Sequence, residues 1–148
     1  MKSLKFATAL VFVLLLGGCA TGPKMAEIGS KIPALKANEA RVYVYRSGSL
    51  IGAGIQPSVL INGKVAGSSK PGGFFFADVA PGSIEVLTST EVEKKLTFTV
   101  EAGQTRYVRT SVGLGVLVYR VYPELVDNAE GAKEIAEASY IGPPLPTR

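Results

Sequence analysis

Histidine is absent from this 148-residue chain, and cysteine occurs once, at position 19. Without histidine there can be no Ser-His or Cys-His nucleophile pair and no zinc site that uses imidazole. A single cysteine cannot form a disulfide within the chain, so the fold must be held by its apolar core. We therefore predict that the protein is not an enzyme, and that its side chains hold no metal or cofactor.

Net charge is also small. The 16 basic and 12 acidic residues give a formal charge of +4, and Lys2 and Lys5 supply half of that excess. Without these two lysines the charge is +2, which argues against nucleic acid as a partner.

The first 18 residues have the pattern of an export signal. Lys2 and Lys5 form a short positive start, and residues 6–16 follow without a charge. As a helix these eleven residues reach about 16 Å, which is too short for a hydrocarbon core of about 30 Å. A charged start, a short apolar run and small residues at the end are typical of a secretory signal peptide. We expect residues 1–18 to be removed, which leaves 130 of the 148 residues.

Leu16, Gly17 and Gly18 precede Cys19 in a pattern that resembles the lipobox of bacterial lipoproteins. The resemblance implies that Cys19 becomes the N-terminus and carries a covalent diacylglycerol and an acyl chain. A thiolate is a strong nucleophile for that reaction, and two or more chains hold firmly at ~0.8 kcal/mol per buried methylene. The alternative is an ordinary buried cysteine after an ordinary signal. Because Ala20 rather than Asp follows the cysteine, the resemblance further implies the outer membrane, with the domain facing the periplasm.

Residues 19–39 are expected to form a flexible tether, because glycine and proline interrupt any apolar period. A flexible chain of 20 residues spans ~25 Å, enough to lift a domain clear of the lipid headgroups. Three apolar residues in this segment could instead dock on the domain surface: Ile28, Ile32 and Leu35.

Residues 40–141 are predicted to form one all-β domain, a single antiparallel sandwich of seven to eight strands. Segments rich in β-branched and aromatic residues recur about every ten residues, with turn residues between them, as in sandwiches and barrels. The expected strands are 41–46, 58–61, 64–67, 74–79, 84–90, 95–100, 105–112 and 116–121. Asn62-Gly63 between two of them is a strong hairpin signal, since both turn positions need a positive φ.

After Pro123 the pattern changes. Residues 124–139 are rich in Ala and Glu and predict one short helix, packed on the sandwich or across an open edge. Asp127 or Asn128 would cap its start, and Gly131 interrupts it. Residues 142–148 contain three prolines and are expected to form an extended, mobile tail.

The order of these motifs resembles bacterial lipoproteins of domain-of-unknown-function family 2846, and the Pro-Gly turn is similar to that of prealbumin-like and PEGA-type sandwiches. The resemblance implies an exported β domain and supplies no catalytic residue. The residues that carry it are Gly22-Pro23-Lys24, the ARVYVYR segment at 40–46, Asn62-Gly63, Phe74-Phe75-Phe76, Val79-Ala80-Pro81-Gly82 and Glu101-Ala102-Gly103-Gln104.

Two features are candidate binding surfaces. The loop at 47–57 is glycine-rich and contains Leu50, Ile51 and Ile55. These residues either grip a partner or fold over one end of the sandwich. Tyrosines and arginines on adjacent strands could also form an aromatic-basic face for glycan or peptide, or ordinary cross-strand pairs. This set comprises Tyr107, Arg109, Tyr119 and Arg120, together with Tyr43 and Tyr45.

Ser68-Ser69-Lys70 could suggest a Ser-Lys dyad, but it is better explained as the polar end of a hairpin before Pro71. Taken together, the patterns favour a lipid-anchored envelope protein that is a non-catalytic binding or structural module. Its expected partners are the membrane, through the anchor, and an envelope protein or glycan. The alternatives are an accessory subunit of a larger envelope assembly that docks by strand addition, and an enzyme of unfamiliar type.

Overall fold

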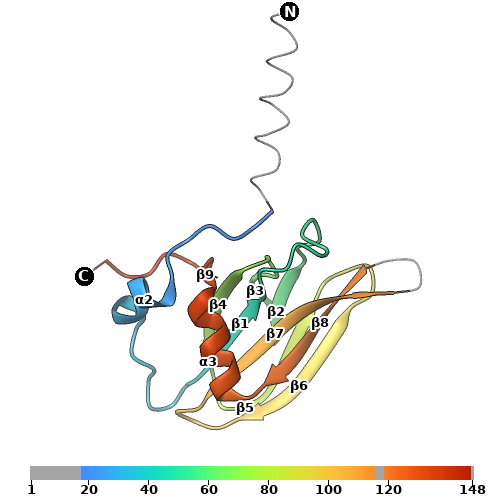
Figure 1. Ribbon diagram of the computed structural model, residues 1–148. Coiled ribbons are helices and arrows are strands. Elements are labelled where there is room, and N and C mark those ends of the chain that lie inside the picture. The colour runs from blue at the N-terminus through green and yellow to red at the C-terminus, as the bar shows by residue number, and fades with distance from the viewer. Residues whose placement is uncertain (1–17, 116–118, 148) are drawn as a thin grey trace, which may run out of the picture.

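A computed structural model of the chain describes residues 18–115 and 119–147 (Figure 1). Residues 1–17 of the expected export signal at 1–18 lie outside the described residues, as do positions 116–118 of the last expected strand. Within the described residues, nine strands form two sheets, and a helical layer covers the outer face of one of them. The predicted β-sandwich is confirmed.

Seven of the strands match the predicted ones within a few residues. The first sheet has the order β8-β7-β1-β4-β9, and the second has the order β3-β2-β5-β6. The strands span β1 Ala40–Arg46, β2 Ser58–Ile61, β3 Lys64–Ser68, β4 Gly73–Val79, β5 Gly82–Thr88, β6 Lys94–Val100, β7 Thr105–Leu114, β8 Tyr119–Val126 and β9 Ser139–Tyr140.

Two details of the predicted sandwich need correction. The described strands number nine rather than seven or eight, because Ser139 and Tyr140 add a short ninth strand. The first sheet is also mixed rather than antiparallel, since β1 runs parallel to β7 and β4 runs parallel to β9. Parallel neighbours need a long connection, and here the chain makes all four strands of the second sheet between β1 and β7.

The Asn62-Gly63 turn joins β2 to β3 as predicted. Both residues have positive φ, 50° for Asn62 and 79° for Gly63, and Ile61 pairs with Lys64 across the turn. The Asn62 side-chain oxygen also accepts a hydrogen bond of 2.9 Å from the Glu85 backbone N–H. That bond ties the hairpin to β5.

The main core lies between the two sheets. Every second residue of β1 faces it, and β4 and β7 contribute in the same alternation. Its buried members are Ala40, Val42, Val44, Val59, Ile61, Phe75, Ile84, Val86, Val100 and Val108.

The opposite face of the first sheet is apolar as well, and helices cover it (Figure 1). Helix α3, Asn128–Glu137, packs there, and Asp127 caps it by accepting a 2.8 Å hydrogen bond from the Ala129 N–H. The predicted helix and its cap are therefore confirmed, but the helix starts later than position 124 because residues 124–126 pair with β7 as part of β8.

The expected tether at 19–39 is docked along much of its length. Helix α2, Met25–Ile28, and the 3-10 turn η2, Gly29–Lys31, lie near α3, and Ile28 is buried beneath them with Ile32 beside it. The Ala20 N–H donates to the Pro71 carbonyl at 2.8 Å, and the Tyr140 N–H donates to the Pro23 carbonyl at 2.8 Å. The folded unit thus begins at residue 20 rather than 40, because the apolar outer face attracts this segment.

The segment after β9 also contacts the domain. The Tyr140 hydroxyl donates a 2.8 Å hydrogen bond to the Pro143 carbonyl, and Leu145 packs against the outer apolar cluster. Residues 143 and 145 are therefore held against the domain in this structure.

Candidate functional site

Cys19 lies at one end of the sandwich, with its side chain exposed. The residues on both sides of it are held to the domain. The Gln56 amide donates a 3.1 Å hydrogen bond to the Gly18 carbonyl, and the Ala20 N–H bonds to Pro71. The sole thiol of the chain therefore stands in solvent directly beside the β1–β2 and β3–β4 connections.

The β1–β2 loop, residues 47–57, lies close to Cys19, because Gln56 of the loop is bonded to the preceding residue, Gly18. Leu50 is 75% exposed and Ile51 is 68% exposed, while Ile55 is half-buried. The two aliphatic side chains at the tip thus face solvent, as a partner-binding loop requires. Ile55 is partly exposed and lines a hollow beside the loop.

Arg46, at the end of β1, fixes the conformation of this loop. It is only 3% exposed, and its guanidinium donates to four backbone carbonyls: Ile55 at 2.6 Å, Gly52 at 2.9 Å, and Ile51 and Ser69 at 3.2 Å each. Burial lowers the pKa of Arg46 below its ordinary value. Five N–H donors in a planar fork suit a set of carbonyls arranged around one point. These hydrogen bonds therefore hold the loop in a defined conformation.

Sequence reasoning missed the role of Arg46, although a signal was present. Val42, Val44 and Arg46 alternate along β1, so the arginine falls on the side that faces the core. A charged residue at an inward position must find polar partners. The glycine-rich loop directly after it could have been recognised as the source of those carbonyls.

A hollow of about 520 Å³ lies beside the loop. It is lined by Ile55 to Pro57 of the loop, by Ser89 to Glu91 and by Tyr119. Its lining is mainly apolar with a few polar groups, and it is open to solvent. The hollow lies between the loop and the start of β8, so Tyr119 is at the same end of the molecule as the loop.

The proposed aromatic-basic face is divided by the structure. Tyr107 pairs with Val126 at one end of the β7–β8 hairpin, whereas Tyr119 pairs with Leu114 at the other end, beside Arg120. Tyr107 and Tyr43 stack with ring centroids 5.3 Å apart, in the layer beneath α3. The structure therefore does not form one continuous binding face from Tyr107, Arg109, Tyr119 and Arg120.

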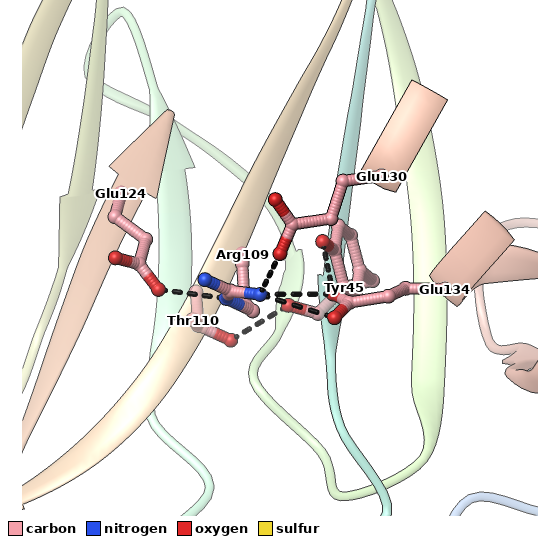
Figure 2. A network of polar contacts seen from close by, with 6 residues as sticks. All are labelled: Tyr45, Arg109, Thr110, Glu124, Glu130 and Glu134. Carbon is pink, nitrogen blue, oxygen red and sulfur yellow. Dashed lines mark hydrogen bonds and ion pairs between the residues drawn. The ribbon is translucent and has the colours of Figure 1, made fainter. Parts of the chain in front are cut away.

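Arg109 is engaged by acidic residues, as Figure 2 shows. Its guanidinium pairs with Glu124 at 2.7 Å, Glu130 at 2.7 Å and Glu134 at 3.0 Å. Glu124 comes from β8, while the other two glutamates project from α3. Hydrogen bonds and ion pairs with them raise the pKa of Arg109. The arginine thus fastens α3 to the sheet and offers little to a ligand.

Tyr45 belongs to the same network. Its hydroxyl donates a short hydrogen bond to Glu134, and Thr110 donates to the Tyr45 carbonyl at 3.1 Å (Figure 2). Burial, followed by the hydrogen bond and charge of Glu134, raises the pKa of the Tyr45 hydroxyl well above its ordinary value. This tyrosine is a structural partner of α3.

Ser69 is buried, and its hydroxyl lies 2.8 Å from that of Thr110. Its carbonyl accepts one of the hydrogen bonds from Arg46. This arrangement agrees with the hairpin-end interpretation of Ser68-Ser69-Lys70 rather than with a dyad.

Over residues 18–115 and 119–147, no group of three or more acidic or cysteine side chains is arranged to hold a metal ion. In the same residues no helix is long and apolar enough to cross a membrane.

The family model described as "Protein of unknown function (DUF2846)" matches residues 36–121, more than half of the chain. The chain belongs to this family. The suspected family resemblance is therefore confirmed. Searches of curated proteins and of solved structures find no match.

The DUF2846 segment contains β1 to β7 and the beginning of β8. Arg46 and the loop at 47–57 thus lie inside the family segment. Cys19, helix α2 and helix α3 lie outside it, although Arg109 within the segment pairs with α3.

Proposed function

We propose that this DUF2846 protein is a lipid-anchored module of the bacterial cell envelope, acylated at Cys19 and without catalytic activity of its own. The observation that carries the proposal is the position of the sole cysteine. It is exposed, and it directly precedes Ala20, the residue whose N–H is bonded to Pro71.

The exposure of Cys19 argues against its being an ordinary core cysteine. Free cysteines are among the most buried residue types in folded proteins. An exposed thiol at the boundary of the fold is accessible to the enzymes that would modify it, and acyl chains attached there would not disturb the core. Together with the lipobox-like pattern before it, this position favours acylation.

The polar side chains of the domain support a non-catalytic role. Arg109 is paired with three glutamates, Arg41 is paired with both oxygens of Asp78, and Ser69 is bonded to Thr110. These pairs connect elements of the fold to each other. The solvent-facing features at the Cys19 end are aliphatic and suit contact rather than chemistry.

The alternative of an accessory subunit that docks by strand addition needs an open sheet edge. The exposed edge strand β3 is short and has a register shift against β2, a bulge-like irregularity that discourages pairing. Edge strand β8 contains Pro123, which has no N–H to donate. Edge strand β9 has two residues. These three edges are poor templates, and the fourth edge strand, β6, lies close to β8 of the other sheet, so a contact through the Cys19 end is the better candidate.

Acylation is tested by expressing the full chain with an alkyne analogue of palmitate in a bacterial host that processes lipoproteins. The wild-type protein should take up label and sediment with membranes. Cys19→Ser should lose the label and keep its signal peptide, which adds about 2 kDa at ~110 Da per residue. Thr21→Ser, two residues away, serves as the matched control and should behave as wild type. Equal labelling of Cys19→Ser and wild type would refute the proposal.

Placement at the outer membrane is a separate part of the proposal. Density separation of inner and outer membranes should recover the wild-type protein with the outer membrane. Ala20→Asp should shift it to the inner membrane, whereas Ala20→Ser should not. Recovery of wild type with the inner membrane would contradict the placement and leave the acylation result intact.

A further inference from the structure

Exposed hydrophobic side chains gather at the end of the molecule that carries Cys19. Leu114 is 79% exposed and Tyr119 is 45% exposed, and Leu50 and Ile51 of the loop are similarly open. These are four of the seven exposed large hydrophobic residues in the part of the chain that the structure describes. Scattered exposed aliphatics need no explanation, but a gathering of them marks an interaction surface.

The topology explains why they meet. Strands β1 and β7 are parallel, and Arg46 at the end of β1 pairs with Thr110. The C-terminal ends of β1 and β7 therefore lie at the same end of the sheet, as Figure 1 shows. A Cβ on Gly52 would lie 2.7 Å from Val112, so the loop packs against the final part of β7. Tyr119 joins them through the hollow that it shares with Ile55.

The link between Cys19 and this surface is short. Gly18 would be removed with the expected signal, but Ala20 remains and its N–H is bonded to the Pro71 carbonyl. The next residue, Gly72, donates to the carbonyls of Arg46 and Ser47 at the start of the loop. A flexible tether would have allowed the domain to stand ~25 Å above the headgroups. With the chain fixed from residue 20 onward, lipid on Cys19 holds the loop end of the domain at the membrane surface.

The loop is also rigid enough to present its tip. Three carbonyls of the loop accept hydrogen bonds from Arg46 and fix its base, and the Ile51 N–H is bonded to the Ser49 hydroxyl at 3.2 Å. Leu50 and Ile51 therefore remain in solvent although neighbouring apolar surface is available. Keeping two large aliphatic side chains exposed costs free energy that burial in another phase would recover.

We propose that Leu50 and Ile51, supported by Leu114 and Tyr119, insert into the interfacial layer of the bilayer that holds the Cys19 anchor. The inference rests on the proposed acylation and adds a second, non-covalent membrane contact. Aliphatic side chains partition into the boundary between headgroups and acyl chains, and tyrosine favours that layer. Val92 lies at the same end but is flanked by exposed Glu91 and Glu93, which limits the contact to a shallow one.

The contact is tested by introducing a photo-crosslinking amino acid into the full chain in cells, at position 50, 51 or 114 in separate variants. Val65 provides the matched control, because it is 69% exposed and lies beside the turn at the other end of β2. After irradiation, lipid adducts are measured by mass spectrometry, and acylation of Cys19 is read on the same samples. We expect lipid adducts at positions 50, 51 and 114 and none above background at 65.

The two readouts separate the inference from the proposed function. An acylated protein without lipid adducts at 50 and 51, or with the same yield at 65, overturns the membrane contact and leaves the anchor standing. Adducts to a protein in place of lipid also overturn it. In a protein that is not acylated, lipid adducts confined to the loop end support the contact while refuting the anchor, and their absence refutes both.

Discussion

Gly131 of α3 lies so close to Tyr107 of β7 that a Cβ at position 131 would come within 2.3 Å of the Cβ and Cγ atoms of the tyrosine. Such a distance is shorter than any ordinary contact, and the atoms approached belong to the base of the side chain rather than to its mobile end. The glycine that interrupts the helical pattern in the sequence is thus the residue that lets α3 approach the sheet.

Gly131→Ala is therefore expected to destabilise the protein. Alanine improves helix propensity by ~1 kcal/mol, but overpacking at this contact costs roughly 1–3 kcal/mol, so the net change should be a loss. Thermal and denaturant unfolding of the purified protein would measure it. Gly29→Ala is the matched control, because a Cβ there meets nothing within 4 Å and the backbone is already helical. A melting temperature of Gly131→Ala equal to or above wild type would contradict the expectation.

Much of the fold could be predicted from the sequence because local signals and tertiary contacts agree. Alternation along β1 predicts the strand, and Asn62-Gly63 predicts the hairpin with its positive φ values. The Pro123 boundary misled the prediction, since apolar residues after it continue β8 through pairing with β7. Parallel pairing of β1 with β7 has no local signature and could not be inferred from residue patterns.

The candidate site was predicted in part. Exposure of Leu50 and Ile51 agrees with a glycine-rich loop. For Tyr43, Tyr45 and Tyr107 the sequence allows both a binding face and ordinary cross-strand pairs, and Tyr43 does pair with Tyr107 across β1 and β7. These tyrosines lie in the layer beneath α3. An aromatic outer face of a sheet can be covered by a helix of the same chain as well as by a ligand. The docking of Ile28 has the same cause. Which segment covers the face depends on tertiary contacts, which residue spacing alone does not specify.

Arg46→Met should loosen the loop at 47–57 and destabilise the fold. The substitution leaves the carbonyls of Gly52, Ile55 and Ser69 without their charged donor, at a cost of roughly 2–4 kcal/mol. Limited proteolysis is expected to cut first within 47–57, and the melting temperature should fall. Arg46→Lys should rescue only part of the loss, because a single ammonium cannot reproduce the planar fork.

Lys64→Met provides a control for the Arg46 experiment, since it removes a positive charge from an exposed position at the opposite end of β2. It should leave the protease pattern unchanged. If Arg46→Met retained the wild-type pattern and melting temperature, the guanidinium would not be what holds the loop.

The raised pKa of Tyr45 predicts a loss of stability in alkaline solution. An unfolded tyrosine titrates near pH 10, so above that pH the unfolded state has lost a proton that the folded state retains. Stability is therefore constant below about pH 10 and falls as pH rises further, by up to ~1.4 kcal/mol per pH unit for one proton. Tyr107 and Tyr140, whose pKa values are also raised by burial, act in the same direction.

Tyr45→Phe should make that alkaline decline less steep, and it removes the hydrogen bond to Glu134 at every pH. Both effects can be measured by denaturant unfolding between roughly pH 8 and pH 11, a range that brackets the ordinary pKa of tyrosine. Tyr119→Phe, which changes an exposed side chain, is the control and should preserve the wild-type slope. Parallel curves for Tyr45→Phe and wild type would show that Tyr45 does not carry the pH dependence.

Gly63→Val should weaken the β2–β3 hairpin. Gly63 has a φ of 79°, and a Cβ there meets no neighbour within 4 Å, so the cost arises from the backbone rather than from crowding. A β-branched residue in this region costs about 1–2 kcal/mol, and the melting temperature should fall accordingly. Lys64→Val, one residue later in β3, places the same side chain at an ordinary strand position and should be nearly neutral. Because the Cys19 end lies at the far side of β2, palmitate labelling should be the same in both variants, and a loss of label with Gly63→Val alone would show that the hairpin and the anchor are coupled.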